Sequence, residues 1–411
     1  MAYPYNETHT QLERKILYTS TPEYVQTPEA LAAALAKLAA SPFVALDTEF
    51  LRERTYYPKF CLLQIADDSF CALIDVLALP SLDPLLEFLN DRNRLKVLHA
   101  AHQDLEVLAL ANGAVLNGTE KKSLVPISGP FLDTQVAAAF LDMPASIGYA
   151  DLVQRRLNHT LQKGQSRTDW SQRPLSAAQL TYAADDVIYL VELYHDLKKA
   201  LGDTSRWGWI EEEAEHLEDA RLYSTEPRDA WQRLRFLDQL EPAQRAAAKA
   251  LAEWREHRAM LKDRPRSWIL SDDALRATAQ RLPVTIDSLG AIPELPKGLI
   301  EKRGDELLKL LSDSKAQAIN EPPAQDFRPS RTQQKQVASL MDVVRKEGAR
   351  LHISPERLAT RRDIEALVFS GRVGNLGQGW RWHSFGERLI KLAGKEAENN
   401  DNPLGTDARS A

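Results

Sequence analysis

Two patterns of apolar residues divide this chain, and the point where one replaces the other limits the folds open to it. From residue 20 to about 200, short runs rich in Val, Ile, Leu and Phe alternate with segments of helical spacing. From about residue 221 onward, the strand-like runs nearly disappear. The sequence therefore predicts an α/β domain with a mixed sheet, followed by all-helical domains.

The α/β part has clear candidates for individual strands and helices. The expected strands are residues 43–50, 60–67, 71–76 and 95–100. The expected helices are residues 80–90, 103–111, 133–141, 149–157 and 176–201, the last with Ser176 as its N-cap. The first three strands follow one another at short intervals, as in hairpins, whereas the fourth comes after a helix.

Pro-rich breaks and the loss of strand signal suggest domain boundaries along the chain. We expect an N-terminal extension (1–19), an α/β domain (20–205), a connecting helix or linker (206–224), a first helical domain (225–315), a Pro-rich linker (316–330), a second helical domain (331–395) and a disordered tail (396–411). The helical domains share a weak internal repeat. In each, a long helix precedes a loop with an apolar residue before Ser (Leu270-Ser271 and Ile353-Ser354), and a capped helix follows.

Length, charge and cysteine content exclude some classes of protein. The 411 residues exceed the roughly 250–300 at which a single core stops growing. The net charge of −6 excludes attraction of nucleic acid through overall charge, so any basic surface must be local. There are only two cysteines, no apolar N-terminal segment and no run of about 18 apolar residues, so we expect a cytoplasmic protein with no membrane anchor.

Acidic residues occur where a buried strand ends. Asp47 and Glu49 are two apart on the strand FVALDTEF, so both side chains point to one face. Asp104 lies near the start of the helix after the fourth strand, and Tyr182 and Asp186 are four apart on the last helix of the domain. Taken singly, each has an ordinary alternative: a surface strand end, a helix cap or an amphipathic helix.

As an ordered set, these residues resemble the active site of the DEDD 3′–5′ exonucleases. The tyrosine variant fits, because Thr181 rather than His lies five residues before Asp186. The stretches LDTEFLRERTYYPKFCLLQIA, HAAHQDLEVL, FLDTQVAAAFL, GYADLV and DWSQRPLSAAQLTYAADDVIYL are similar to the ribonuclease D family. The resemblance covers roughly residues 20–395 and implies a ribonuclease H-like nuclease domain followed by two HRDC-like domains. The chain departs from the family between Ala111 and Phe131, where a long surface loop is expected.

The resemblance also implies a reaction. Asp47, Glu49, Asp104 and Asp186 would hold two Mg²⁺ or Mn²⁺ ions, which offset the buried acidic charge and support hydrolysis of a phosphodiester bond. Tyr182 would position the attacking water, because a phenol with a pKa of about 10 is a poor base at neutral pH. The expected activity is 3′–5′ trimming of RNA, tRNA precursors in particular, with release of nucleoside 5′-monophosphates.

Other residues are candidates for substrate contact. Phe50 follows the first acidic motif and, by resemblance, could wedge against the terminal base. Lys163, Arg167 and Arg173 lie in a loop before the last helix of the domain, where they could meet phosphates of a single-stranded 3′ tail. Such a cation-rich loop is otherwise simply solvated.

Two further groups have both a functional and a structural interpretation. His99 and His102 form an HxxH pattern that could suggest a metal, but hard oxygen ligands suit Mg²⁺ better, so a structural or substrate-edge role is favoured. Residues 327–391 hold thirteen Lys or Arg against six Asp or Glu. In this block Trp380 and Trp382 stand among arginines, a composition that suits single-stranded RNA, although packing of the tryptophans is the favoured alternative.

Two alternative functions stay open at this point. A DNA exonuclease could use the same residues, and no sequence feature reads a 2′-hydroxyl. A non-catalytic RNA-binding scaffold could keep the fold, although it would not need four carboxylates and a tyrosine. Nothing in the sequence demands more than a monomer.

Overall fold

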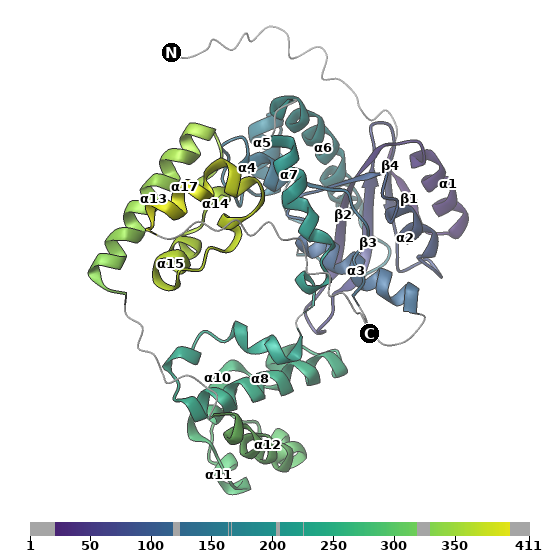
Figure 1. Cartoon of the computed structure of the whole chain (residues 1–411). Helices are drawn as coiled ribbons and strands as arrows, with labels where there is room; N and C mark the ends of the chain where they lie inside the picture. The colour runs from purple at the N-terminus through teal and green to yellow at the C-terminus, as the bar shows by residue number, and fades with distance from the viewer. Residues whose placement is uncertain are drawn as a thin grey trace, which may run out of the picture. The chain divides into compact units, whose positions relative to one another are not determined.

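The computed structural model describes residues 21–117, 124–162, 164–165, 167–202, 206–224, 226–318 and 329–394 (Figure 1). They form two compact units. The first unit comprises the described residues within Met1–Glu49, Phe60–Ala220 and Pro329–Ala411, and the second comprises those within Phe50–Lys59 and Arg221–Arg328. The expected N-terminal extension and C-terminal tail lie outside the described residues.

A mixed sheet forms the centre of the first unit, as predicted. Its strands are β1 (Glu23–Val25), β2 (Phe43–Leu51), β3 (Lys59–Ala66), β4 (Cys71–Ile74), β5 (Leu95–Leu98) and β6 (Phe131–Asp133). The spatial order is β1-β4-β3-β2-β5-β6. β3 and β4 are antiparallel, whereas β2 with β5, β5 with β6 and β1 with β4 are parallel. Since β2 lies inside the sheet, its apolar residues Phe43 to Leu46 are almost completely buried.

Helices pack around this sheet (Figure 1). They are α1 (Pro28–Leu38), α2 (Asp83–Leu89), α3 (His102–Asn117), α4 (Thr134–Ala139), α5 (Tyr149–Leu157), α6 (Ala177–Leu201) and α7 (Arg206–Glu215). Ser176 caps α6 and forms a capping box with Gln179, which confirms the predicted start of that helix. Helix α3 continues to Asn117, so residues 112–117 of the expected long loop are helical, and residues 118–123 lie outside the described residues.

A second helical block belongs to the same unit as the sheet. It contains α13 (Arg331–Leu351), α14 (Pro355–Leu358), α15 (Arg361–Ser370), α16 (Gly379–Arg381) and α17 (Glu387–Leu392). The indole of Trp380 stacks on Trp209 of α7 at a centroid distance of 5.0 Å, and its Nε1 donates a hydrogen bond to Glu213 at 2.7 Å. Arg381 forms an ion pair with the same glutamate. Because Trp380 and Trp382 are 2% and 9% exposed, the packing alternative is confirmed for both.

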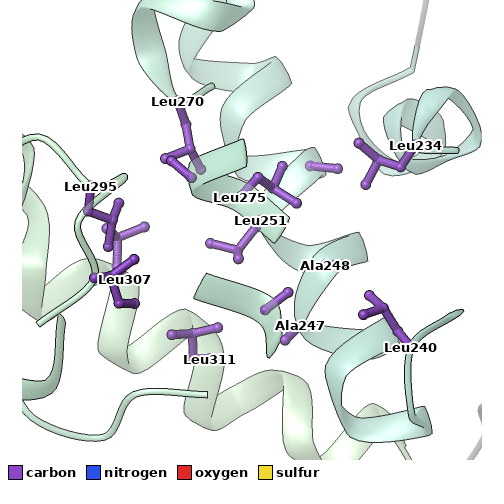
Figure 2. Close-up of a cluster of buried hydrophobic side chains, with 14 of the residues drawn as sticks. Leu234, Leu240, Ala247, Ala248, Leu251, Leu270, Leu275, Leu295, Leu307 and Leu311 are labelled. Carbon is purple, nitrogen blue, oxygen red and sulfur yellow. The ribbon is translucent and has the colours of Figure 1, made fainter. Parts of the chain in front are cut away.

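The second unit is helical. It contains two short 3₁₀ segments (Pro227–Arg233 and Leu237–Gln239) and helices α8 (Pro242–Lys262), α9 (Arg266–Ile269), α10 (Asp272–Arg281), α11 (Ile286–Gly290) and α12 (Lys297–Gln317). Figure 2 shows its core, in which Leu251 of α8 lies among Leu275 of α10 and Leu307 and Leu311 of α12. None of the helices in the described part of the chain is long and apolar enough to span a membrane.

Candidate active site

Strand β2 supplies the first two carboxylates of the candidate site. Its apolar half is buried between β3 and β5, so the strand holds Asp47 and Glu49 on a rigid element. Glu49 is only 9% exposed, and Asp47 is half-buried. The intervening Thr48 is also buried, and its hydroxyl donates a hydrogen bond of 2.6 Å to Oδ1 of Asp104.

Helix α6 supplies a third carboxylate and the tyrosine. Tyr182 and Asp186 are one helical turn apart, so both lie on the same face. One carboxylate oxygen from each of Asp47, Glu49 and Asp186 lies within 4.8 Å of the other two. Strand and helix thus bring together acidic residues that are more than 130 positions apart in the sequence.

Asp104 lies beside this cluster rather than within the group of three. It occupies the first turn of α3, is 7% exposed and accepts the hydrogen bond from Thr48. Its charge nevertheless adds to the effect of burial in raising the pKa of both Asp47 and Glu49. Asp104 therefore lies near enough to the other carboxylates for their charges to interact, with Thr48 holding one of its oxygens.

The carboxylates strongly disfavour one another's ionised form. Burial and the charges of Asp186 and Asp104 raise the pKa of Glu49 to about 9. Burial raises the pKa of Asp104 to about 7 and that of Asp186 to about 8, and the pKa of Asp47 is also well above its usual range. In addition, Oδ2 of Asp186 is buried without a hydrogen-bond partner in the described structure. Hard oxygen ligands with excess negative charge and an unsatisfied oxygen fit divalent cations.

Tyr182 stays a neutral phenol in this environment. Burial, followed by the charges of Asp186 and Glu49, raises its pKa above the ordinary value of 10. The ring lies 6.1 Å from that of the buried Trp170, at a tilt of 40°. A tyrosine held in this way can donate or accept a hydrogen bond but cannot act as a base near neutral pH.

Comparison with known proteins agrees with this geometry. A family model described as 3′-5′ exonuclease matches residues 22–202, and one described as HRDC domain matches residues 244–311. A ribonuclease D from Acidiphilium cryptum is 36% identical over 380 residues, covering 91% of this chain and 93% of the relative. One from Jannaschia sp. is also 36% identical and covers 91% and 96%. The chain belongs to the ribonuclease D family.

Members of the ribonuclease D family also share the fold. The crystal structure of Escherichia coli RNase D, described as an exoribonuclease involved in structured RNA processing, superposes with a TM-score of 0.76 at 30% identity, covering 91% of this chain and 98% of that one. The chain is therefore a 3′–5′ exoribonuclease with an exonuclease domain and an HRDC domain. The assignment of residues 331–395 as a second HRDC-like domain stays a prediction.

The structure places the expected substrate-contact residues of this ribonuclease D in different surroundings. Phe50 continues β2 directly after Glu49 and is half-buried. Arg167 is exposed, and Lys163 lies outside the described residues. Arg173 is held by the protein itself: its guanidinium pairs with both oxygens of Asp75, each at 2.6 Å. Their contacts with RNA stay predictions.

Arg173→Ala should destabilise the protein. Asp75 is 1% exposed, and hydrogen bonds from Arg173 and Tyr24 hold its pKa below the usual range despite the opposing effect of burial. Truncation leaves a buried carboxylate without its main partner, a loss of about 3–5 kcal/mol. Thermal unfolding measures the change. Arg167→Ala is the matched control, because loss of an exposed cation should change stability by no more than about 0.5 kcal/mol. Equal unfolding temperatures for the two variants would contradict a stabilising role of Arg173 as the partner of Asp75.

Tyr149 is a residue near the site that sequence reasoning did not single out. Its hydroxyl donates a hydrogen bond of 3.1 Å to the backbone oxygen of Asp185, next to Asp186. Burial and then the charges of Asp186 and Asp47 raise its pKa. The signal was present in the stretch GYADLV, which carries part of the family resemblance, but no spacing linked it to the acidic residues.

His99 has a structural role in this ribonuclease D. Its Nδ1 lies 3.0 Å from Oγ1 of Thr134, and its Nε2 lies 3.1 Å from the carbonyl oxygen of Ile147. Both ring nitrogens therefore have partners in the protein, and His99 is absent from the acidic cluster. Asp133 is the N-cap of α4 and accepts the hydrogen bond of the Gln135 amide.

Proposed function

We propose that this ribonuclease D trims the 3′ ends of tRNA precursors and other structured RNAs in the cytoplasm, as a monomer, and releases nucleoside 5′-monophosphates. This proposal rests on three carboxylates whose oxygens lie within 4.8 Å of one another, those of Asp47, Glu49 and Asp186. Asp104 lies beside them and is held by Thr48. The substrate class is supported by the Escherichia coli relative, whose structure is described as that of an exoribonuclease involved in structured RNA processing.

Four carboxylates are proposed as the ligands of two Mg²⁺ or Mn²⁺ ions. These ions supply charge stabilisation and an acidified water for in-line displacement at phosphorus. Asp47 and Glu49 reach the site from a strand inside the sheet, so their positions vary little. Thr48 holds Oδ1 of Asp104 by its hydrogen bond. Asp186 contributes the buried oxygen that has no partner in the described structure.

Tyr182 is proposed to orient the attacking water through its hydroxyl. Because burial and the charges of Asp186 and Glu49 keep the phenol protonated, the proton of the water must go elsewhere, and the residue acts by hydrogen bonding. Phe50, next to Glu49 on the chain, is proposed to contact the terminal base, and Lys163, Arg167 and Arg173 to lie along the RNA backbone.

Tyr182→Phe should lower kcat by about 10- to 100-fold, the value of one hydrogen bond of about 1.5–3 kcal/mol to a charged or polarised partner. KM and metal affinity should change little, because the ring and the carboxylates remain. Single-turnover hydrolysis of a 5′-labelled RNA measures the chemical step. A loss as large as that of a carboxylate variant would contradict the positioning role.

Residues 331–394 are proposed as a second HRDC-like domain, because they repeat the first in element order. Helices α8 and α13 each have 21 residues and end at a residue in the left-handed region, Asp263 or His352. A four-residue helix follows in each case, then a ten-residue helix whose N-cap, Ser271 or Thr360, accepts a backbone N–H. The expected domain boundaries, 20–205, 225–315 and 331–395 among them, are proposed from the loss of strand signal and the Pro-rich breaks in the sequence.

An RNA hairpin with a single-stranded 3′ tail and a 5′ label tests the proposed function. In Mg²⁺ or Mn²⁺, the wild-type protein should shorten it from the 3′ end, and EDTA should stop the reaction. The matching DNA serves as competitor. Shortening of DNA but not of RNA would indicate a DNA exonuclease. Binding of RNA without any shortening would indicate a non-catalytic RNA-binding scaffold. A tRNA precursor compared with an unstructured tail of equal length tests the substrate class.

A further inference from the structure

The connection between β2 and β3 belongs to the unit that contains the HRDC domain. Residues Phe50–Lys59 follow Glu49 directly along the chain, yet they form one compact unit with Arg221–Arg328. The last two residues of β2, Phe50 and Leu51, are part of this segment. The acidic motif and the first two residues of the segment are thus consecutive parts of strand β2.

Backbone and side-chain contacts hold this segment in place. The amides of Tyr56 and Tyr57 both donate to Oδ1 of Asp263, each at 3.0 Å. Asp263 sits at the C-cap of α8 with φ of 47°, a left-handed conformation that Asp and Asn tolerate better than most residues. The two tyrosines are only 8% and 7% exposed.

An ion pair between Arg266 and the buried Glu256 completes the attachment. The hydroxyl of Tyr56 donates to Oε1 of Glu256 at 2.5 Å, and Glu256 is 1% exposed. Arg266 binds both oxygens of Glu256, at 2.5 and 2.6 Å, and also donates to the Tyr56 hydroxyl at 3.1 Å. Its guanidinium lies 4.6 Å from the centre of the Tyr56 ring. These contacts join residues about 200 positions apart, so tertiary packing holds the segment.

We infer that Asp263, Glu256 and Arg266 of the HRDC domain are positioning residues for the exonuclease reaction, acting through Tyr56 and Tyr57. They fix one end of a short segment whose other end is the metal-ligand strand. Displacing a metal ligand by about 1 Å can lower the rate 100-fold. Contacts that hold the residues after β2 should therefore support the rate by keeping Asp47 and Glu49 in position. The inference rests on the proposed role of Asp47 and Glu49.

Asp263 offers a matched pair of variants in the full-length protein. Asp263→Gly keeps the left-handed backbone but removes the acceptor of both amides, whereas Asp263→Asn keeps an Oδ1 acceptor. His352→Gly makes the same type of change at the equivalent helix end of the other helical block, where φ is 51°. Tyr56→Phe removes the hydroxyl from the Glu256 and Arg266 contacts and keeps the ring.

Two measurements are made on each variant. The first is kcat and KM on a 5′-phosphorylated RNA dinucleotide, a substrate too short to need a distant RNA-binding surface. The second is hydrogen exchange of backbone amides, in EDTA, for peptides covering residues 44–66 and for peptides of α8 to α12. Hydrogen exchange does not depend on turnover. It therefore tests whether these contacts hold the segment Phe50–Lys59 in place even if the wild-type protein fails to hydrolyse RNA.

Asp263→Gly and Tyr56→Phe should lower kcat on the dinucleotide by about tenfold, below the 100-fold limit of a 1 Å displacement, with KM nearly unchanged. Exchange should rise at residues 44–66 and not in α8 to α12. Asp263→Asn and His352→Gly should behave like the wild type. Unchanged kcat and exchange in both test variants would overturn the inference, as would increased exchange confined to α8 to α12, which indicates a folding defect of the HRDC domain alone.

Discussion

Asp186→Asn should reduce exonuclease activity by about 10³-fold or more, because a metal ion contributes several kcal/mol of charge stabilisation and each 1.36 kcal/mol is a factor of ten. Asp186 contributes the buried oxygen that lacks a partner, and it meets Asp47 and Glu49 within 4.8 Å. An amide has the same size but a neutral oxygen and two donor hydrogens, which oppose a cation. Rates on a 5′-labelled RNA, together with calorimetric titration of Mg²⁺, measure both consequences.

Asp185→Asn is the matched control for this substitution. Asp185 is adjacent on α6 and also has a raised pKa from burial, but its carboxylate is not among the three that meet. We expect its activity to stay within a few-fold of the wild type. In EDTA at pH 9, Asp186→Asn should unfold at a higher temperature than the wild type, because the substitution removes one of the ionised buried carboxylates that repel one another. An active Asp186→Asn variant, or one that binds Mg²⁺ normally, would contradict the ligand assignment.

Without divalent cations, the protein should lose stability as the pH rises from about 5 to 9. Asp104, Asp186 and Glu49 have folded-state pKa values of about 7, 8 and 9, all above the values of about 4 in an unfolded chain. A raised folded-state pKa favours the folded state while the group is protonated, and this contribution disappears as the pH passes the folded-state value. Because each factor of ten in an acid dissociation constant is worth about 1.4 kcal/mol, the loss should reach several kcal/mol, or about 5–10 °C in unfolding temperature.

Divalent cations should largely remove this dependence on pH, since they bind the ionised carboxylates and release protons. Unfolding temperatures from pH 5 to 9, in EDTA and in excess Mg²⁺, test the expectation. Glu49→Gln removes the group with the pKa of about 9 and should flatten the upper part of the EDTA curve. A wild-type curve in EDTA that rises with pH over this range would show that the carboxylates are not mutually destabilising.

The sequence predicts the acidic centre better than its surroundings. Asp47 and Glu49 follow an apolar strand, and Tyr182 and Asp186 share a helix face, so local periodicity places each pair and the order of motifs relates them. The attachment of Asp104 to Thr48 had no sequence signal, because it depends on how α3 follows β5 beside β2. Asp104 therefore had to be assigned from the resemblance alone.

Features that depend on long-range packing escaped prediction. Strands β1 and β6 have three residues each, too few for a period of two to be visible. Arg173 was grouped with exposed cations because its partner, Asp75, lies 98 positions away. The mixed sheet and the helical domains could be predicted from the sequence, because they depend on repeated patterns of residues rather than on single contacts.

The division of the sheet-containing unit into separate stretches of sequence affects its synthesis. Its residues up to Ala220 leave the ribosome before the stretch Arg221–Arg328 of the second unit, whereas those from Pro329 follow that stretch. At about 5–20 residues per second, the intervening segment delays completion by roughly 5 to 20 seconds. During this interval Glu213 has no Arg381 and Trp209 has no Trp380. A nascent nuclease domain would thus expose an aromatic and acidic surface to chaperones and proteases until its last helices arrive.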